Sequence, residues 1–207
     1  MGAPVDYPVT LSVDTFEGER NKLTTFFRPF VAVPILIILG LLGGGSYGWE
    51  NSPWSYDLPL AGMVFLPTIL MLLFQQKYPR WWFDWNLNMT RFVLRVASFM
   101  MLLRDEYPST DEEQSVHIEL AYPDAATLSR GLPLVKWFLA IPHLIVLGFL
   151  SIAVWVCVIA AWCVILFTGK YPASLFEFVV GYLRWDLRVV AYAFLLTTDQ
   201  YPPFSLD

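Results

Sequence analysis

Long apolar runs alternate with short polar segments along the chain, and the longest run extends from Gly131 to Gly169. From Trp137 to Thr168 it contains no Asp, Glu, Lys or Arg. A helix needs about 20 apolar residues to cross a bilayer core of roughly 30 Å. The run is long enough for two such helices, and it therefore predicts a transmembrane hairpin that turns near Gly148–Ser151.

Two shorter apolar runs predict a first hairpin, with spans at Thr24–Leu42 and Leu58–Phe74. Pro34 is expected to kink the first span, because proline has no backbone N–H to donate to the helix. Residues 43–58 are rich in Gly, Pro, Trp and Tyr. This composition is typical of a loop that is anchored at the membrane interface.

Two other apolar segments, Trp81–Leu103 and Leu175–Leu196, each carry a narrow polar stripe at helical spacing. The stripes consist of Asp84, Asn88, Arg91 and Arg95 in the first segment and of Glu177, Gly181, Arg184 and Arg188 in the second. Arginine is costly at the bilayer centre, so the stripes predict two amphipathic helices that lie in the interface.

The basic residues of these segments have two open interpretations. Arg91, Arg95, Arg184 and Arg188 can contact lipid phosphates or the carboxylates of a partner subunit, and so can Arg28 and Lys136 at the start of the spans. The equal alternative is pairing inside the chain, with acids such as Glu177 or Asp199 or with the other half of the protein.

Apolar and polar residues alternate at Tyr7–Asp14 and again at His117–Tyr122, which predicts two short strands. A strand with open edges is unstable alone, so we expect the two to pair with each other or with strands of a neighbouring copy.

The order of strand, apolar hairpin, striped helix and Tyr-Pro occurs twice, which predicts an internal parallel duplication. The first repeat covers residues 1–108, an acidic linker covers 109–116, and the second repeat covers 117–207. The matched pairs are Pro34 with Pro142, Arg28 with Lys136, Asp105 with Asp199 and Tyr107 with Tyr201. The prolines, aspartates and tyrosines are expected to have structural roles, the aspartates as helix caps or in ion pairs.

These elements define an all-α integral membrane protein with four transmembrane helices in two hairpins, two interfacial amphipathic helices and two short cytoplasmic strands. The composition agrees, because 57% of the residues are hydrophobic and 15% are charged. All thirteen Lys and Arg lie on one side of the predicted spans, which places that side and both termini in the cytoplasm. The net charge of −5 argues against a nucleic-acid partner.

The stretches that allow a comparison with a family are FFRPFVAVP, WFLAIPHLIVLG, LFTGKYPASLFEFVVGYLRW and DQYPPF. They resemble the bacterial membrane family known as domain of unknown function 4389, in two tandem copies over nearly the whole chain. The first copy departs from the pattern, because Ile35 replaces His143 and RDEYPS replaces DQYPPF. The resemblance implies a membrane protein and no particular activity.

His143 is the one ionisable side chain deep in a predicted span, apart from the two cysteines. It is a weak candidate for a haem ligand, a proton carrier or a quinone contact. The alternative is an imidazole that bonds to a backbone carbonyl freed by Pro142. Cys157 and Cys163 lie about 240° apart on a helix, so neither a disulfide nor a metal pair is expected, and no cofactor or metal is predicted.

The sequence contains no phosphate-binding loop and no hydrolase or metalloprotease motif, so we expect no enzyme activity. The predicted function is a membrane scaffold or an accessory subunit of a larger membrane assembly, with lipids, further copies of itself or other membrane subunits as partners. Its arginine helices would contact lipid headgroups or those subunits. Two alternatives stay open: a small-solute carrier or channel, if the arginine helices span the membrane, and an electron-transfer subunit that binds a cofactor through His143.

Overall fold

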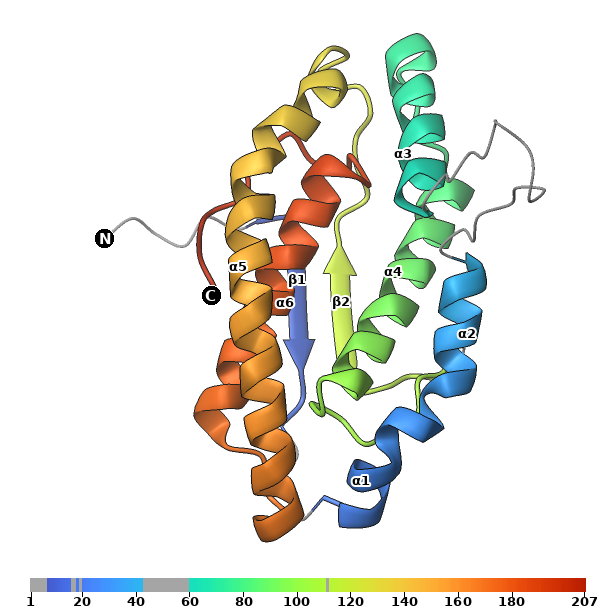
Figure 1. The fold of residues 1–207 in the computed structure, drawn as a ribbon. Coiled ribbons are helices and arrows are strands. Elements are labelled where there is room, and N and C mark those ends of the chain that lie inside the picture. The colour runs from blue at the N-terminus through green and yellow to red at the C-terminus, as the bar shows by residue number, and fades with distance from the viewer. Residues whose placement is uncertain (1–6, 16–17, 19, 43–59, 111) are drawn as a thin grey trace, which may run out of the picture.

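The computed structural model describes residues 7–15, 18, 20–42, 60–110 and 112–207. Its elements, in chain order, are β1 (Val9–Val13), α1 (Lys22–Val31), α2 (Val33–Leu42), α3 (Leu60–Leu70), a π-helical turn η1 (Met71–Gln75), α4 (Arg80–Met100), β2 (Val116–Leu120), α5 (Leu132–Thr168) and α6 (Ala173–Ala193). Helix α5 runs along almost the whole length of the molecule with α6 antiparallel beside it, and α6 contacts β1 whereas α4 contacts β2 (Figure 1).

The two predicted strands are present and pair with each other in an antiparallel sheet. Val9 lies opposite Leu120 and Val13 opposite Val116. The alternation in the sequence decides which face is buried, because Val9, Leu11 and Val13 point inwards and the residues between them are exposed. The expectation that the strands pair within the chain is therefore confirmed.

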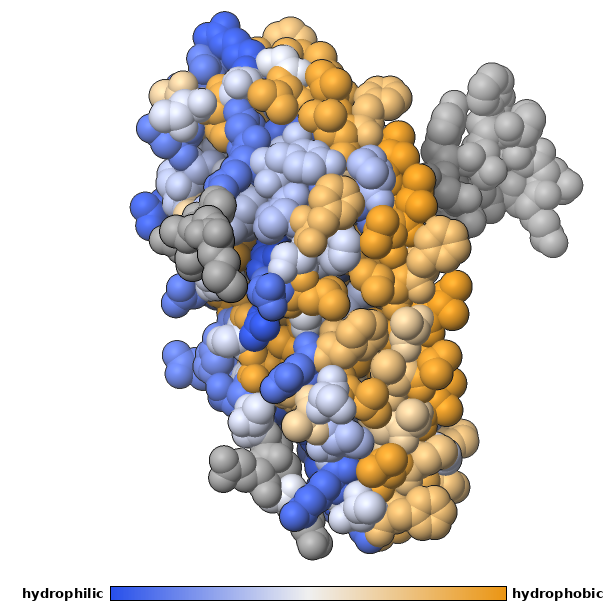
Figure 2. Space-filling model, turned by 90° about the vertical axis from the view of Figure 1, so that its left-hand side faces the viewer, coloured by the Kyte–Doolittle hydropathy of each residue, from blue (hydrophilic) through white to orange (hydrophobic). Residues whose placement is uncertain are grey.

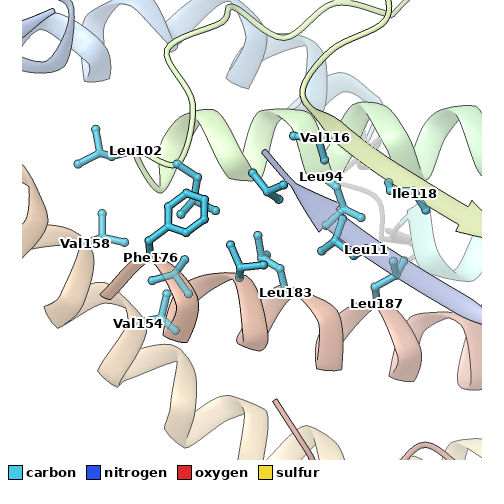
Figure 3. Close-up of a cluster of buried hydrophobic side chains, with 14 of the residues drawn as sticks. Leu11, Leu94, Leu102, Val116, Ile118, Val154, Val158, Phe176, Leu183 and Leu187 are labelled. Atoms are coloured by element: carbon cyan, nitrogen blue, oxygen red, sulfur yellow. The ribbon is translucent and has the colours of Figure 1, made fainter. Parts of the chain in front are cut away.

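The main core lies between the sheet and the helices α4 and α6. Leu11 of β1 and Ile118 of β2 meet Leu94 of α4 and Leu183 and Leu187 of α6 (Figure 3). All five side chains are at most 5% exposed. Helices α4 and α6 therefore cover the apolar face of the sheet together, which fixes the direction in which their polar stripes point.

The hairpin predicted for Gly131–Gly169 is wrong, because Leu132–Thr168 forms one continuous helix of 37 residues. Its length is about 55 Å at 1.5 Å per residue. The predicted turn at Gly148–Ser151 lies inside the helix, where the Ser151 hydroxyl donates to the Gly148 carbonyl at 2.7 Å. A single glycine costs a helix only about 1 kcal/mol, and α6 packs alongside, so nothing forces the chain to turn.

The first predicted hairpin is also wrong. The run at Thr24–Leu42 is broken into α1 and α2 at Ala32, two residues before Pro34, whose ring and missing N–H disfavour a continuous helix there. The second run forms α3 and η1, in which the apolar helical stretch Phe65–Gln75 is too short to cross a membrane. The loop predicted at 43–58 lies outside the described residues.

The described part of the chain thus has two helical segments long and apolar enough to cross a membrane, Lys22–Gly40 and Leu132–Thr168, and not four spans in two hairpins. The expected parallel duplication is wrong as well. Two short helices meet at a break in the first half, whereas one long helix occupies the second half, and the two strands run antiparallel. The similar order of residues in the two halves does not extend to similar helices, because the apolar run of the first half is broken at Ala32 and that of the second half is continuous.

Large apolar side chains are exposed along one side of the molecule, on α1, α2, α3 and α5. The side view in Figure 2 shows hydrophobic residues gathered along one edge and hydrophilic residues along the opposite edge. On α5 the exposed residues reach from Leu134, which is 54% exposed, to Phe167, which is 84% exposed. This helix therefore presents an uncovered apolar surface over its whole length.

The continuity of α5 can be measured by placing spin labels at Leu134→Cys and Phe167→Cys in a background with Cys157→Ser and Cys163→Ser. A single straight helix separates the labelled backbone positions by about 50 Å. A hairpin would bring them within about 10–20 Å, because neighbouring helices pack at 8–10 Å. A short distance in a pulsed electron-resonance measurement on the detergent-solubilised protein would contradict the continuous helix.

Candidate functional site

A buried cluster of charges joins α1 to the segment that follows α4. Arg28, only 3% exposed, forms an ion pair with Asp105 and donates to the carbonyls of Phe99 (2.9 Å) and Arg104 (2.8 Å). Arg20 lies 3.3 Å from the same carboxylate. Burial lowers the pKa of Arg20, and the charge of Asp105 opposes this effect. One carboxylate therefore serves two buried guanidinium groups.

A second pair joins α5 to the segment that follows α6. The side chain of Lys136 is fully buried, and its Nζ lies 2.7 Å from Oδ1 of Asp199 and donates to the Thr198 carbonyl at 2.7 Å. The other oxygen of Asp199 accepts the N–H of Ser129 at 2.7 Å. Burial alone would raise the pKa of Asp199, but the Lys136 ammonium and the Ser129 N–H lower it overall.

Two arginines of the predicted stripes donate hydrogen bonds to backbone carbonyls at the outer edges of the sheet. Arg91 donates to the carbonyl of Ile118 (3.4 Å) and Arg184 to the carbonyl of Leu11 (3.0 Å). Leu11 and Ile118 face each other in the register, at a pair whose carbonyls point out of the ladder. Each arginine therefore occupies one outer edge, where another strand could otherwise add.

The remaining two arginines of the stripes donate hydrogen bonds to backbone carbonyls in the segments that follow their own helices. Arg95 donates to the carbonyl of Ser109 at 2.7 Å, and Arg188 donates to the carbonyls of Ser205, at 3.3 Å, and Asp207. All six cations expected to contact lipid or a partner thus bond to carbonyls or carboxylates of this chain, which is the arrangement that the alternative of internal pairing describes. Their contact with lipid or with a partner stays a prediction.

His143 lies in an aromatic pocket and is fully buried. Its Nδ1 accepts the indole N–H of Trp185 at 3.0 Å, and its ring stacks on Phe204 with the ring centroids 3.9 Å apart. Its Nε2 has no hydrogen-bond partner among the described residues. The expected bond to a backbone carbonyl is therefore replaced by a bond from Trp185, and no group of three metal-binding side chains lies within the described ranges.

The C-terminal segment closes this pocket. The hydroxyl of Tyr201 donates to the Leu139 carbonyl at 3.1 Å, and the Leu206 carbonyl lies 2.7 Å from the point where a Cβ on Gly181 would stand. The close approach requires glycine at position 181, since any larger side chain would push the segment away from α6. His143 is accordingly placed as a packing residue between α5, α6 and this segment.

The other residues with predicted structural roles lie near these pairs. The ring of Tyr107 packs edge-on against Phe99, with the ring centroids 5.8 Å apart. Pro34 stands just inside α2, after the break at Ala32, whereas Pro142 lies within α5 and does not interrupt it. The two matched prolines therefore have different structural consequences.

A cavity of about 280 Å³ lies between α4 and α6 and is lined by Asn86, Thr90 and Asp186 together with apolar side chains. The polar stripes in the sequence did not predict it. Asp186 is two residues from both Arg184 and Arg188, so it projects about 200° away from either arginine. Polar residues on the side of each helix opposite the stripe would have been the signal for this cavity.

The described residues form an apolar, helix-rich protein with buried charges and two helical segments long and apolar enough to cross a membrane. Residues 133–205 match the model of the family described as domain of unknown function (DUF4389). The match supports the expected family for α5, α6 and the C-terminal segment in one copy, and a second copy in residues 1–108 is not supported. No curated protein and no solved structure matches the chain.

The buried pair at α5 can be tested with Lys136→Met, which leaves Asp199 without its cation. Removing one partner of a buried pair typically costs about 3 kcal/mol or more, so we expect a loss of this size in the free energy of unfolding. Since the pKa of Asp199 is lowered in the folded protein, the pair contributes fully above the ordinary Asp pKa, and its contribution is lost as the pH falls through the lowered value. Denaturant unfolding in detergent at pH 7 therefore measures the whole effect.

The matched control is Lys170→Met, because Lys170 follows the other end of α5 and is exposed. We expect this variant to change the free energy of unfolding by less than about 0.5 kcal/mol. Equal effects of the two substitutions would show that the Lys136–Asp199 pair does not stabilise the fold.

Proposed function

We propose that this protein is a non-enzymatic membrane scaffold or accessory subunit, whose helices α1, α2 and α5 lie in lipid. The observation that carries the proposal is the exposure of its most apolar segments. Only 22% of the most apolar 18-residue window is buried in Lys22–Gly40, and the same share is buried in Leu132–Thr168. An apolar surface of this extent is unfavourable in water and needs a lipid or protein cover.

Two simpler explanations of such helices fit less well. The core helix of a soluble protein has a similar composition but is mostly buried, unlike either segment here. A signal sequence lies near the N-terminus, which could apply to Lys22–Gly40 but not to Leu132–Thr168. The long helix α5 is therefore the stronger support for a membrane location.

The length of α5 favours a tilted or in-plane position. Its exposed apolar side chains begin at Leu134 and end at Phe167, whereas a helix perpendicular to the membrane needs only about 20 residues to cross the hydrocarbon core. A strong tilt, or a position along the membrane surface, keeps more of this stripe in lipid. The hydrophilic side of the molecule would then face the aqueous phase (Figure 2).

This orientation leaves the hydrophilic side for partner subunits or further copies of the chain, and the apolar side for membrane lipids. By the positive-inside rule, we place the hydrophilic side on the cytoplasmic side of a bacterial inner membrane. We favour this role over a carrier or an electron-transfer subunit because Arg28 and Lys136 are bonded to carboxylates within the chain, and one nitrogen of His143 is bonded to Trp185.

Substitution of a lipid-facing residue tests the membrane location. Phe149 of α5 is 72% exposed, and a charge at the centre of a membrane helix costs roughly 3 kcal/mol. We expect Phe149→Lys to shift a large fraction of the protein from the carbonate-washed membrane pellet to the soluble or aggregated fraction. The control Glu119→Lys, at an exposed position of β2, should stay in the pellet, and equal behaviour of both variants would contradict the proposed orientation.

The scaffold role predicts a particle larger than one chain of 23.7 kDa after gentle extraction from the native membrane. Native mass spectrometry should find either several copies with bound lipid, which supports a self-assembling scaffold, or other membrane subunits, which supports an accessory subunit. A bare monomer that retains neither lipid nor partner would speak against both forms of the proposal.

A further inference from the structure

The cavity between α4 and α6 adjoins the main core, because Leu94 and Leu187 line it and also pack against the sheet. Arg184 reaches the sheet, where it donates to the Leu11 carbonyl, and Asp186 lies about 200° further round the same helix. Apart from Asn86, Thr90 and Asp186, every residue that lines the cavity is apolar. Its volume of about 280 Å³ is near the lower end of the range for small-molecule sites.

Asn86 is a buried amide at the wall of this cavity, and it is 2% exposed. Its side-chain carbonyl oxygen accepts no hydrogen bond within the described residues. The Tyr78 hydroxyl lies near enough to accept one N–H of this amide and donates its own proton to the Leu195 carbonyl at 2.9 Å, so it does not supply the missing donor. A buried polar group normally has a hydrogen-bond partner, so Asn86 indicates that a ligand with a hydrogen-bond donor binds in the cavity.

Asp186 is a carboxylate without a counter-ion in the same cavity. Within the described chain it has no ion pair and no hydrogen bond, and no basic side chain lines the cavity. Burial raises the pKa of Asp186 to about 6, so the group is still mostly ionised at neutral pH. An ionised carboxylate in an apolar site is unfavourable unless a cation joins it.

Thr90 supplies a third oxygen. Its hydroxyl donates to the Asn86 backbone carbonyl at 2.8 Å, so that the oxygen keeps its lone pairs for a further donor. The cavity therefore offers three acceptors, from Asp186, Asn86 and Thr90, which matches the three N–H donors of a primary ammonium group.

We propose that this cavity binds a lipophilic primary amine, with the ammonium group at Asp186, Asn86 and Thr90 and the apolar chain against Val93, Val190 and Phe194. The polar groups supply charge and direction, and the apolar lining supplies the affinity for the chain. The inference goes beyond the scaffold role and does not rest on it, because neither α4 nor α6 is a candidate membrane span.

The proposal can be tested with octylamine, octanol and octanoate, which share a chain length and differ in the head group. A ligand that binds the folded state alone raises the unfolding temperature, so each compound is added at equal concentration to the detergent-solubilised protein and unfolding is followed. We expect octylamine to raise the unfolding temperature and to bind about tenfold more tightly than octanol, because an ion-paired hydrogen bond is lost with the alcohol. Octanoate should have no effect.

Asp186→Asn keeps the shape of the side chain and removes the charge. We expect it to bind octylamine about tenfold more weakly than the unaltered protein, so that the preference over octanol disappears. Without ligand, this variant should be at least as stable as the unaltered protein, since the apolar cavity no longer holds an unpaired charge, and this result excludes misfolding as the cause. The control is Asp84→Asn, which changes an exposed carboxylate of α4 and should leave octylamine binding unchanged.

The same ammonium chemistry is present in phosphatidylethanolamine, so a second arm separates a membrane lipid from a free amine. The protein is placed in phosphatidylcholine nanodiscs with or without phosphatidylethanolamine, and the lipid it retains is measured by native mass spectrometry. Retention of phosphatidylethanolamine that Asp186→Asn abolishes would make the lipid the source. Octylamine binding without such retention would make a free lipophilic amine the source.

Equal binding of octylamine and octanol by the unaltered protein would overturn the proposal, because the carboxylate would then contribute nothing. An undiminished response of Asp186→Asn to octylamine would overturn it as well. Failure in the membrane-pellet experiment would leave this result untouched, because the amine assay uses protein in detergent.

Discussion

Two buried cations hold the apolar helices to the rest of the fold. Arg28 of α1 and Lys136 of α5 are each at most 3% exposed, and each meets an aspartate in the segment that follows α4 or α6. Because α1 and α5 leave most of their apolar surface uncovered, hydrophobic burial within the chain can fix only part of their position. The ion pairs add direction, since a buried charge tolerates very few placements of its partner.

The sheet depends on the same kind of bond. Two strands alone are marginally stable and leave two open edges. Arg91 and Arg184 occupy those edges by donating to Ile118 and Leu11, while the apolar faces of α4 and α6 cover the sheet between them. These arginines thus bond within the chain, and the exposed large apolar side chains lie mainly on α1, α2, α3 and α5.

The parts that the sequence predicted correctly are those in which a local pattern has one meaning. Alternation at Tyr7–Asp14 and His117–Tyr122 predicted the two strands that the structure has at Val9–Val13 and Val116–Leu120. The spacing of the arginines identified α4 and α6 as helices. The few polar residues in the apolar run of α5 do not distinguish two antiparallel helices from one long helix. The repeated order of residues likewise suggested equal halves, although packing of the apolar runs is a long-range property.

The candidate site shows the same limit. The pairing of Arg28 with Asp105 and of Lys136 with Asp199 could be suspected, because these residues recur in the same order in both halves. The cavity at Asp186 could not be placed, since it exists only where α4 and α6 lie beside each other in the folded chain. The partner of His143 was missed because Trp185 lies 42 residues further along the chain, on another helix.

The pairing of β1 with β2 also has a consequence for the order in which the chain folds. Val13 is paired with Val116, and the apolar helices α1, α2 and α3 and the helix α4 all lie between them in the sequence. During synthesis β1 must therefore wait, without its partner, until the ribosome has made more than half of the protein. Contacts between such distant segments form slowly. The apolar helices α1, α2 and α3 are therefore synthesised, and must be shielded from water, before the sheet can form.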